Sequence, residues 1–222
     1  DTLRESDFLV FLDADVTIAT DYLDCLAMAF SSSTYRAVQS YNGVANPEEN
    51  WRTALTYAGF AGVNHLRPLG QDRLFGGTLL KGTGMAFQTD VLLERGWPAR
   101  SIVEDMEMTL CLAKEDIAVH YCPEAWMISR AESTAARADS QRRRWEGGRL
   151  QIMAQYVPRL AALCWRKPRR LYVGLLLELL TPPLSLLVLL DVIWVMSAWG
   201  YGWHWAAYSG ITCLSITGFY TV

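Results

Sequence analysis

The chain has 222 residues, a formal net charge of −3 and five cysteines, and hydrophobic residues make up 51% of it. The cysteines are widely spaced and include no C-x-x-C pair, so a disulfide framework and a zinc site of the usual spacing are excluded. The length allows one good-sized domain and a remainder, and the hydrophobic content is high for a domain that lies wholly in water.

The first two thirds of the sequence alternate strand and helix patterns. Short apolar runs predict strands, and apolar residues that recur every three or four positions predict helices. This alternation predicts an α/β layer fold with a largely parallel sheet. The expected elements are strand 8–13, helix 19–31, strand 35–41, helix 51–66 capped by Asn50, loop 67–77, strand 79–87, helix 89–95, a helix that begins near 104, and strand 117–123.

A basic segment follows. Residues 130–170 contain eleven Arg or Lys and three acids, and a basic helix is expected over 134–157. Such a block suggests an anionic partner, which could be phosphate, nucleic acid or a lipid surface. A solvated helical face is the alternative.

Residues 149–170 form a candidate amphipathic interface helix. Its apolar residues recur at helical spacing, which suits a helix that lies on a membrane surface. Packing against the rest of the domain is the alternative. The apolar residues are Leu150, Met153, Val157, Leu160 and Cys164.

The tail, residues 171–222, is strongly apolar. Residues 171–199 carry only two charges, Glu178 and Asp191. A membrane helix needs about 20 mainly apolar residues, so transmembrane segments are predicted over about 178–198 and about 204–222. A buried helical hairpin is the alternative.

The flanking residues predict an orientation for these spans. Basic residues before the first span place the preceding domain in the cytoplasm of a multi-pass inner-membrane protein. Aromatic residues beyond the first span are expected at the opposite interface. The basic residues are Arg166, Lys167, Arg169 and Arg170, and the aromatic residues are Trp199, Tyr201, Trp203 and Trp205.

Two aspartates, Asp13 and Asp15, end the first predicted strand. Open α/β sheets bind ligands at the carboxyl ends of their strands. Two hard oxygen ligands there suit Mg²⁺ or Mn²⁺, shared with substrate phosphate. Ile18 stands where an EF-hand loop needs glycine, so that calcium site is excluded.

The same residues also fit the D-x-D-x-T pattern of haloacid dehalogenase-type phosphatases. In that alternative Asp13 is the nucleophile and Asp15 the acid/base. The remaining roles would go to Ser40, Lys81 and Asp105. The arginine cluster and the apolar tail would then have no purpose.

A second acidic pair, Glu104–Asp105, stands at the start of a predicted helix. An acid there accepts backbone N–H bonds and is expected to stay ionised. A loop at the edge of the sheet is also where a general base can reach its proton. Helix starts favour acids in any case, so a structural role is the alternative. Glu115–Asp116 is a competing pair, expected in a surface turn.

The third candidate is Q-x-x-R-W, residues 141–145. Gln141 and Arg144 share one helical face, and an Arg fork matches diphosphate oxygens. Trp145 offers a flat face for a sugar ring. A basic surface helix with one core tryptophan is the alternative.

The order D-x-D, E-D, Q-x-x-R-W and apolar tail resembles the processive membrane family 2 glycosyltransferases, such as cellulose, hyaluronan, chitin and poly-N-acetylglucosamine synthases. The resemblance implies a Rossmann-like GT-A fold over 1–148, with the interface helix and spans after it. No residue precedes Asp1, so it also implies only the C-terminal half of the GT-A domain. We therefore expect the chain alone to be inactive.

The resemblance implies a role for each motif. Asp15, helped by Asp13, would hold the metal, and Asp105 would be the general base with Glu104 beside it. Gln141 and Arg144 would lie near the diphosphate and Trp145 near the acceptor. Gly82, Thr83 and Gly84 would form the acceptor floor, although a plain β-bulge is an equal alternative.

The implied reaction is inverting, metal-dependent transfer of a sugar from a nucleotide-sugar, most simply a UDP-sugar, to a growing polysaccharide. The implied partners are donor, glycan acceptor and lipid bilayer, with no nucleic acid. Three alternatives stay open: single-sugar transfer to a lipid, the phosphatase, and a non-catalytic membrane scaffold.

Overall fold

The computed structural model describes residues 7–32, 34–97, 104–131, 153–181 and 184–221. The chain divides into two compact units, Asp1–Leu179 and Leu180–Val222. The first unit is built on one sheet, and the second is a pair of helices.

Five strands form the sheet, in the order β1-β4-β3-β5-β2. Only β3 and β5 pair in parallel, and the other three neighbouring pairs are antiparallel. The prediction of a largely parallel sheet is therefore wrong, because β4 and the unpredicted β2 run against the other strands. The strands are β1 (Phe8–Phe11), β2 (Val16–Ile18), β3 (Ala37–Val44), β4 (Met85–Gln88) and β5 (Val119–Ser129).

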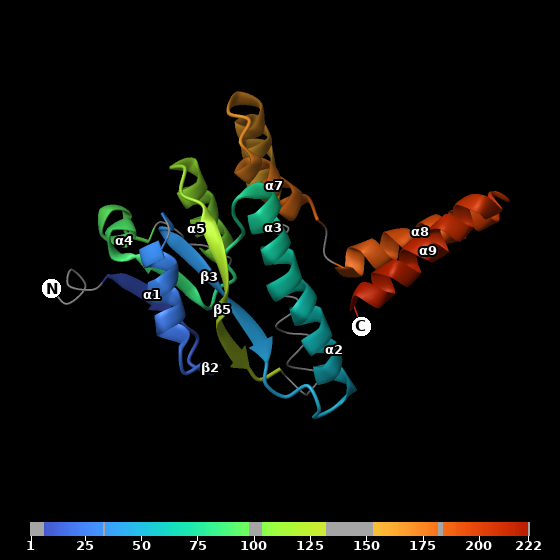
Figure 1. The fold of residues 1–222 in the computed structure, drawn as a ribbon. Coiled ribbons are helices and arrows are strands. Elements are labelled where there is room, and N and C mark those ends of the chain that lie inside the picture. The colour runs from blue at the N-terminus through green and yellow to red at the C-terminus, as the bar shows by residue number, and fades with distance from the viewer. Residues whose placement is uncertain (1–6, 33, 98–103, 132–152, 182–183, 222) are drawn as a thin grey trace. The chain divides into compact units, whose positions relative to one another are not determined.

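Helices cover both faces of the sheet (Figure 1). On one face, α1 (Tyr22–Ser32) buries Tyr22 and Leu26 against side chains of β3 and β4. On the other face, α5 (Glu104–Lys114) buries Met108 and Leu112 in a second core, to which α4 (Thr89–Arg95) also contributes. The helices predicted near 19–31, 89–95 and 104 are confirmed.

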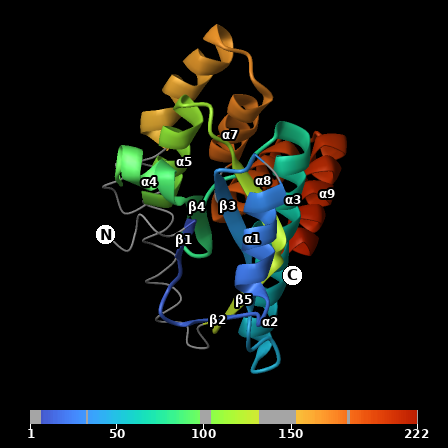
Figure 2. The same cartoon turned by 60° about the vertical axis from the view of Figure 1, so that its left-hand side comes forward.

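A long helical run lies beside β3 and β5 (Figure 2). It consists of α2 (Trp51–Phe60), the π-helical segment η2 (Ala61–Leu66) and α3 (Arg67–Phe75). The side chain of Asn50 accepts hydrogen bonds from the first turn of α2, at 2.9 Å from the Arg52 nitrogen, which confirms the predicted cap.

The prediction of a loop over 67–77 is wrong, because the helical run continues through α3 to Phe75. Pro68 has no N–H to donate to the carbonyl of Asn64. The Tyr121 hydroxyl supplies that donor instead, at 3.0 Å. The helix thus passes the proline with a π segment and ends at Gly76, whose φ of 75° suits a helix C-cap.

The side chain of Asp72 in α3 covers the open edge of β5. Its carboxylate accepts a hydrogen bond from the backbone nitrogen of Tyr121 at 2.9 Å and contacts the His120 ring at 3.0 Å. At this point β5 pairs with β3 on one side only, because β2 begins to pair further along, at Met127. Asp72 therefore satisfies a strand N–H that would otherwise face water.

The helix over 153–166 packs within the first unit. Tyr156 and Leu160 are buried in one core with α5 and α7 (Arg170–Leu180), and Val157 and Cys164 pack against that core. The apolar face predicted for a membrane surface is therefore turned toward the protein at these positions. Leu150 lies outside the described residues.

Helix α7 is joined to the same unit. The buried carboxylate of Glu178 pairs with Arg67 of α3 at 2.6 Å and also accepts a hydrogen bond from Gln71. Gly174 of α7 lies directly on Phe75, the last residue of α3. Glu178, which the sequence analysis placed in a membrane span, is thus held in a polar contact inside the first unit.

The predicted transmembrane segments are corrected by the structure. Among the residues that it describes, no helix is both long enough and apolar enough to cross a bilayer. The apolar run is divided into three helices, because α7 ends at Leu180, α8 spans Leu184–Gly200 and α9 spans His204–Thr221. The segment predicted as one span over about 178–198 therefore contains a break.

The second unit is the α8–α9 hairpin. Its helices contact closely around Ala198, Ala206 and Ala207, which are buried. The indole nitrogen of Trp194 donates to the carbonyl oxygen of Ala206 at 3.0 Å, across the two helices. Small residues at the contact allow the backbones to approach.

We expect Gly174→Ala to destabilise the first unit by about 1–2 kcal/mol, since overpacking outweighs the gain in helix propensity. A Cβ on Gly174 would lie 2.6 Å from the Cβ of Phe75. Thermal unfolding measures the effect. The matched control is Gly70→Ala in α3, where a Cβ would meet nothing within 4 Å; it should leave stability unchanged or raise it. Equal melting of the two variants would contradict the packing argument.

Candidate functional site

The segment from Lys81 to Gly84 meets the end of β1, because β1 and β4 are antiparallel and β4 begins where β1 ends. The backbone nitrogen of Asp13 donates to the hydroxyl of Thr83 at 3.0 Å. The nitrogen of Gly84 donates to the carbonyl of Phe11 at 2.9 Å. The first acidic motif and the glycine motif are thereby joined.

The same segment also meets the start of α5. A Cβ on Gly82 would lie 3.7 Å from Oδ2 of Asp105, so the glycine backbone runs beside this carboxyl group. Gly82 has a φ of 81°, which side-chain-bearing residues rarely adopt. Gly84 has a φ of 70°, and a Cβ there would overlap Met127. Glycine at 84 is thus explained by packing.

The side chain of Gln39 in β3 holds the segment from Lys81 to Gly84 in place, a role that was not predicted from the sequence. Its buried side chain donates to the carbonyl of Thr83 at 2.8 Å and accepts from the nitrogen of Lys81 at 2.8 Å. A second missed residue, Thr109, accepts from the nitrogen of Leu80 at 3.0 Å and donates to the carbonyl of Asp105 at 2.9 Å. Gln39 thus positions the segment on β3, and Thr109 positions the chain just before the segment against α5.

The carboxyl group of Asp105 is strongly perturbed. Burial is the main cause that raises its pKa from 3.8 to about 6, and the nearby charge of Glu104 raises it further. A hydrogen bond from the Met106 nitrogen, at 2.7 Å, and the charge of Lys81 act in the opposite direction. The start of α5 thus favours the ionised form of Asp105, as predicted, but the effect of burial on its pKa is larger. A pKa of about 6 suits a general base near neutral pH.

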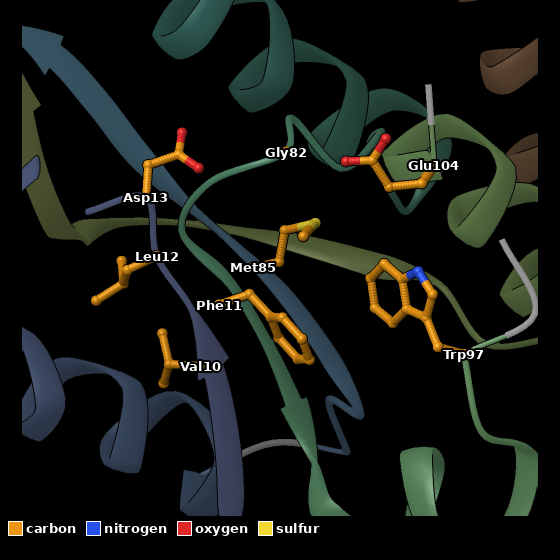
Figure 3. A pocket seen from close by; sticks show the side chains of 8 residues that line it. All are labelled: Val10, Phe11, Leu12, Asp13, Gly82, Met85, Trp97 and Glu104. Carbon is orange, nitrogen blue, oxygen red and sulfur yellow. The ribbon is translucent and has the colours of Figure 1, made fainter. Parts of the chain in front are cut away.

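A cavity of about 510 Å³ lies beside these groups. Figure 3 shows Asp13 and Glu104 on either side of the segment that carries Gly82. The rest of the lining is largely apolar, and the Trp97 ring stacks on Phe11 at 5.1 Å between ring centres. The lining residues are Val10, Phe11, Leu12, Asp13, Gly82, Met85, Trp97 and Glu104.

Asp13 and Asp15 fit a divalent cation by their chemistry. Both are exposed, and neither carboxylate has a hydrogen bond or ion pair with another described residue. Within the described part of the chain, no three His, Cys, Asp or Glu side chains are grouped so that they could hold a metal ion together. Mg²⁺ and Mn²⁺ accept such an open site, because water and substrate phosphate complete their coordination.

Other residues singled out from the sequence have different positions. Gln141, Arg144 and Trp145 lie outside the described residues. In the competing pair, Asp116 has structural partners, because it pairs with Arg169 at 2.8 Å and accepts from the Tyr172 hydroxyl at 3.1 Å. The hydroxyl of Ser40, given a role in the phosphatase alternative, is buried against the Tyr22 hydroxyl at 2.8 Å.

Comparison with known families bears on the phosphatase alternative. The model of the family described as glycosyl transferase family group 2 matches residues 8–220. The chain belongs to this family. The matched range contains the positions of the D-x-D, E-D and Q-x-x-R-W motifs, and the match leaves the phosphatase interpretation without support.

Two individual proteins resemble this member of family group 2. A β-monoglucosyldiacylglycerol synthase from Synechocystis sp. is 26% identical over 195 residues, which is 86% of this chain and 40% of that protein. The mannosyltransferase PcManGT from Pyrobaculum calidifontis, solved with GDP-Man and Mn²⁺, has a TM-score of 0.50 at 16% identity, over 99% of this chain and 62% of its own.

The structural likeness establishes the fold, an α/β GT-A-like glycosyltransferase fold. The chain spans less than two thirds of the length of either relative. These comparisons lend no support to the prediction that the chain alone is inactive.

Asp105→Asn should stabilise the folded protein near neutral pH. Because the pKa is raised in the fold, stability is greatest below about pH 4, where the carboxyl is protonated in both states, and is lost as the pH rises through 6. We expect a gain on the order of 1–3 kcal/mol at pH 7.5 that vanishes near pH 4. Thermal unfolding across pH measures it. Asp24→Asn, at an exposed position in α1, is the control and should give no such pH-dependent gain.

Proposed function

We propose that this protein is a metal-dependent glycosyltransferase that moves a sugar from a nucleotide-sugar to a hydroxyl group with inversion. The observation that carries the proposal is the buried carboxyl group of Asp105. It has a pKa of about 6 and lies beside the backbone of Gly82, one of the residues that line the cavity. Membership of glycosyl transferase family group 2 supports it.

In this proposal Asp105 acts as the general base. Above pH 6 its carboxylate accepts the proton of the acceptor hydroxyl. The acceptor oxygen forms a bond to the anomeric carbon as the bond from that carbon to the diphosphate breaks. One base and no enzymic nucleophile give a single displacement, so the anomeric configuration inverts. Glu104 adds negative charge beside Asp105 and so helps to keep its pKa high.

The leaving nucleoside diphosphate gains negative charge. A divalent cation held by Asp13 and Asp15 would supply electrostatic stabilisation of that charge. Gln141 and Arg144 are proposed to bind the diphosphate, since an Arg fork matches its oxygens. Trp145 and the segment Gly82–Gly84 are proposed to contact the acceptor.

For the acceptor we propose a lipid hydroxyl. This choice is supported by the relative named β-monoglucosyldiacylglycerol synthase. A growing glycan is the second candidate, because Q-x-x-R-W stands at residues 141–145 and the same motif order is typical of polysaccharide synthases. Product analysis separates them, since a lipid acceptor gives a single glycolipid and a polymerase gives a ladder of sizes.

The test follows nucleoside diphosphate release by the full-length protein. The panel contains UDP-glucose, UDP-N-acetylglucosamine and GDP-mannose, with diacylglycerol in mixed micelles, and with Mn²⁺, Mg²⁺ or EDTA. We expect metal-dependent release from one donor, reduced by about 10²–10⁴-fold in Asp105→Asn. Asp24→Asn is the matched control and should retain activity. Release that persists in EDTA and in Asp105→Asn would overturn the proposal.

The pH dependence of kcat/KM gives an independent check. A base with a pKa of about 6 must be ionised to act, so kcat/KM should be level above that pH and fall about tenfold per unit below it. The profile of Asp24→Asn should be the same. A profile without an acidic limb near 6 would exclude Asp105 as the base.

A further inference from the structure

Residues 165–170, here called the turn, comprise the last two residues of the helix over 153–166, the link that follows it and the first residue of α7. They present an unusual set of side chains. Trp165 is 91% exposed, more than any other large hydrophobic side chain that the structure describes. The four basic residues of the turn are also exposed. They are Arg166, Lys167, Arg169 and Arg170.

Among the residues that the structure describes, only one of these four cations has a partner. Arg169 pairs with Asp116 at 2.8 Å. The side chains of Arg166, Lys167 and Arg170 have no ion pair or hydrogen bond to any other described residue. Three charges without a partner among the described residues therefore lie close in sequence to an exposed indole.

The turn is held in place by the first unit. Asp116 binds both Arg169 and the hydroxyl of Tyr172, which is buried just beyond the turn. Within the turn, the nitrogen of Lys167 donates to the carbonyl of Leu163 at 2.8 Å. Arg169 thus anchors the turn, whereas the other three cations are exposed and have no partner among the described residues.

The apolar side of the helix over 153–166 is already buried against other parts of the protein. Tyr156 and Leu160 are buried against α5 and α7, so this helix cannot lay that face on a lipid surface without leaving the protein. Contact with lipid through this region would have to occur at the turn, where Trp165 projects.

We propose that the turn at 165–170 is a docking site for an anionic lipid surface. Tryptophan is favoured at the depth of lipid headgroups, where its ring is half buried and its N–H stays hydrated. Each neighbouring Lys or Arg adds attraction to anionic lipids, and the two signals together bind more firmly than either alone. A single exposed ring offers no row of stacking platforms for successive bases, which argues against nucleic acid.

The experiment measures sedimentation of the full-length protein with vesicles of phosphatidylcholine, with and without phosphatidylglycerol. The α8–α9 hairpin also exposes apolar side chains, among them Met196 and Trp205. Binding to neutral vesicles is therefore the baseline for every variant. The proposal concerns the increase that phosphatidylglycerol produces.

The first variant, Arg166→Glu/Lys167→Glu/Arg170→Glu, leaves the anchor Arg169 in place. It should reduce the phosphatidylglycerol-dependent increase in affinity on the order of 100-fold or more. Trp165→Ser should weaken binding to the same vesicles several-fold, and high salt should abolish the increase.

The matched control is Trp51→Ser/Arg52→Glu. Trp51 is 65% exposed at the start of α2, and Arg52 lies over its ring at 4.6 Å, so the pair is another exposed tryptophan with a basic neighbour. This variant should bind as the wild type does. Circular dichroism and melting establish that each variant is folded.

Three results would overturn the proposal. They are a wild type with no phosphatidylglycerol-dependent increase, an increase unchanged in the triple variant, and an equal loss in the Trp51/Arg52 control. Inorganic phosphate and single-stranded RNA are added as competitors. Displacement by RNA at concentrations at which phosphate has no effect would show a nucleic-acid surface and also reject the lipid assignment.

Discussion

The segment from Lys81 to Gly84 is the constraint on which the candidate site depends. It contacts β1 through Thr83, β3 through Gln39 and α5 through Gly82, so three elements that are far apart in sequence share it. Thr83 contacts Asp13 through its side-chain hydroxyl, whereas the hydrogen bonds to Gln39 and to Phe11 of β1 use backbone atoms of the segment. Its conformation, with positive φ at Gly82 and Gly84, therefore sets the spacing between the acidic motifs.

The position of Asp105 reflects a compromise between stability and chemistry. Burial disfavours its charged form, while the start of α5 and Lys81 favour it, and the balance leaves the pKa at about 6. A fully exposed carboxylate would be a weaker base, and a buried one without these partners would stay protonated at neutral pH. The fold thus carries a destabilising group in a form suited to proton transfer.

The sequence predicts those parts of the structure that have local signals. Asn50 could be recognised as a cap, and the helix at 89–95 has its predicted bounds, because caps and helical periodicity depend on near neighbours. The acidic pairs at 13–15 and 104–105 were found because acids at the ends of elements stand out. Their proposed roles rest on the resemblance and on the tests described above.

Other features had no local signal. Gln39 looks like any polar residue in a strand, and only the fold brings it to the segment at 81–84. The direction of β4 depends on pairing with distant strands. A loop was predicted over 67–77, but the helical run continues there, and the Tyr121 hydroxyl compensates for the donor that Pro68 lacks. An apolar tail looked like two membrane spans, although hydropathy alone does not show where helices end.

The contact of Asp72 with β5 also bears on how the protein behaves in a crowded solution. An open strand edge can pair with a strand of another molecule, which begins aggregation. Asp72 occupies the N–H of Tyr121 and places a negative charge along that edge. A chain attempting to add there would have to displace this carboxylate from its hydrogen bond. One aspartate thereby helps to keep neighbouring copies of the molecule apart.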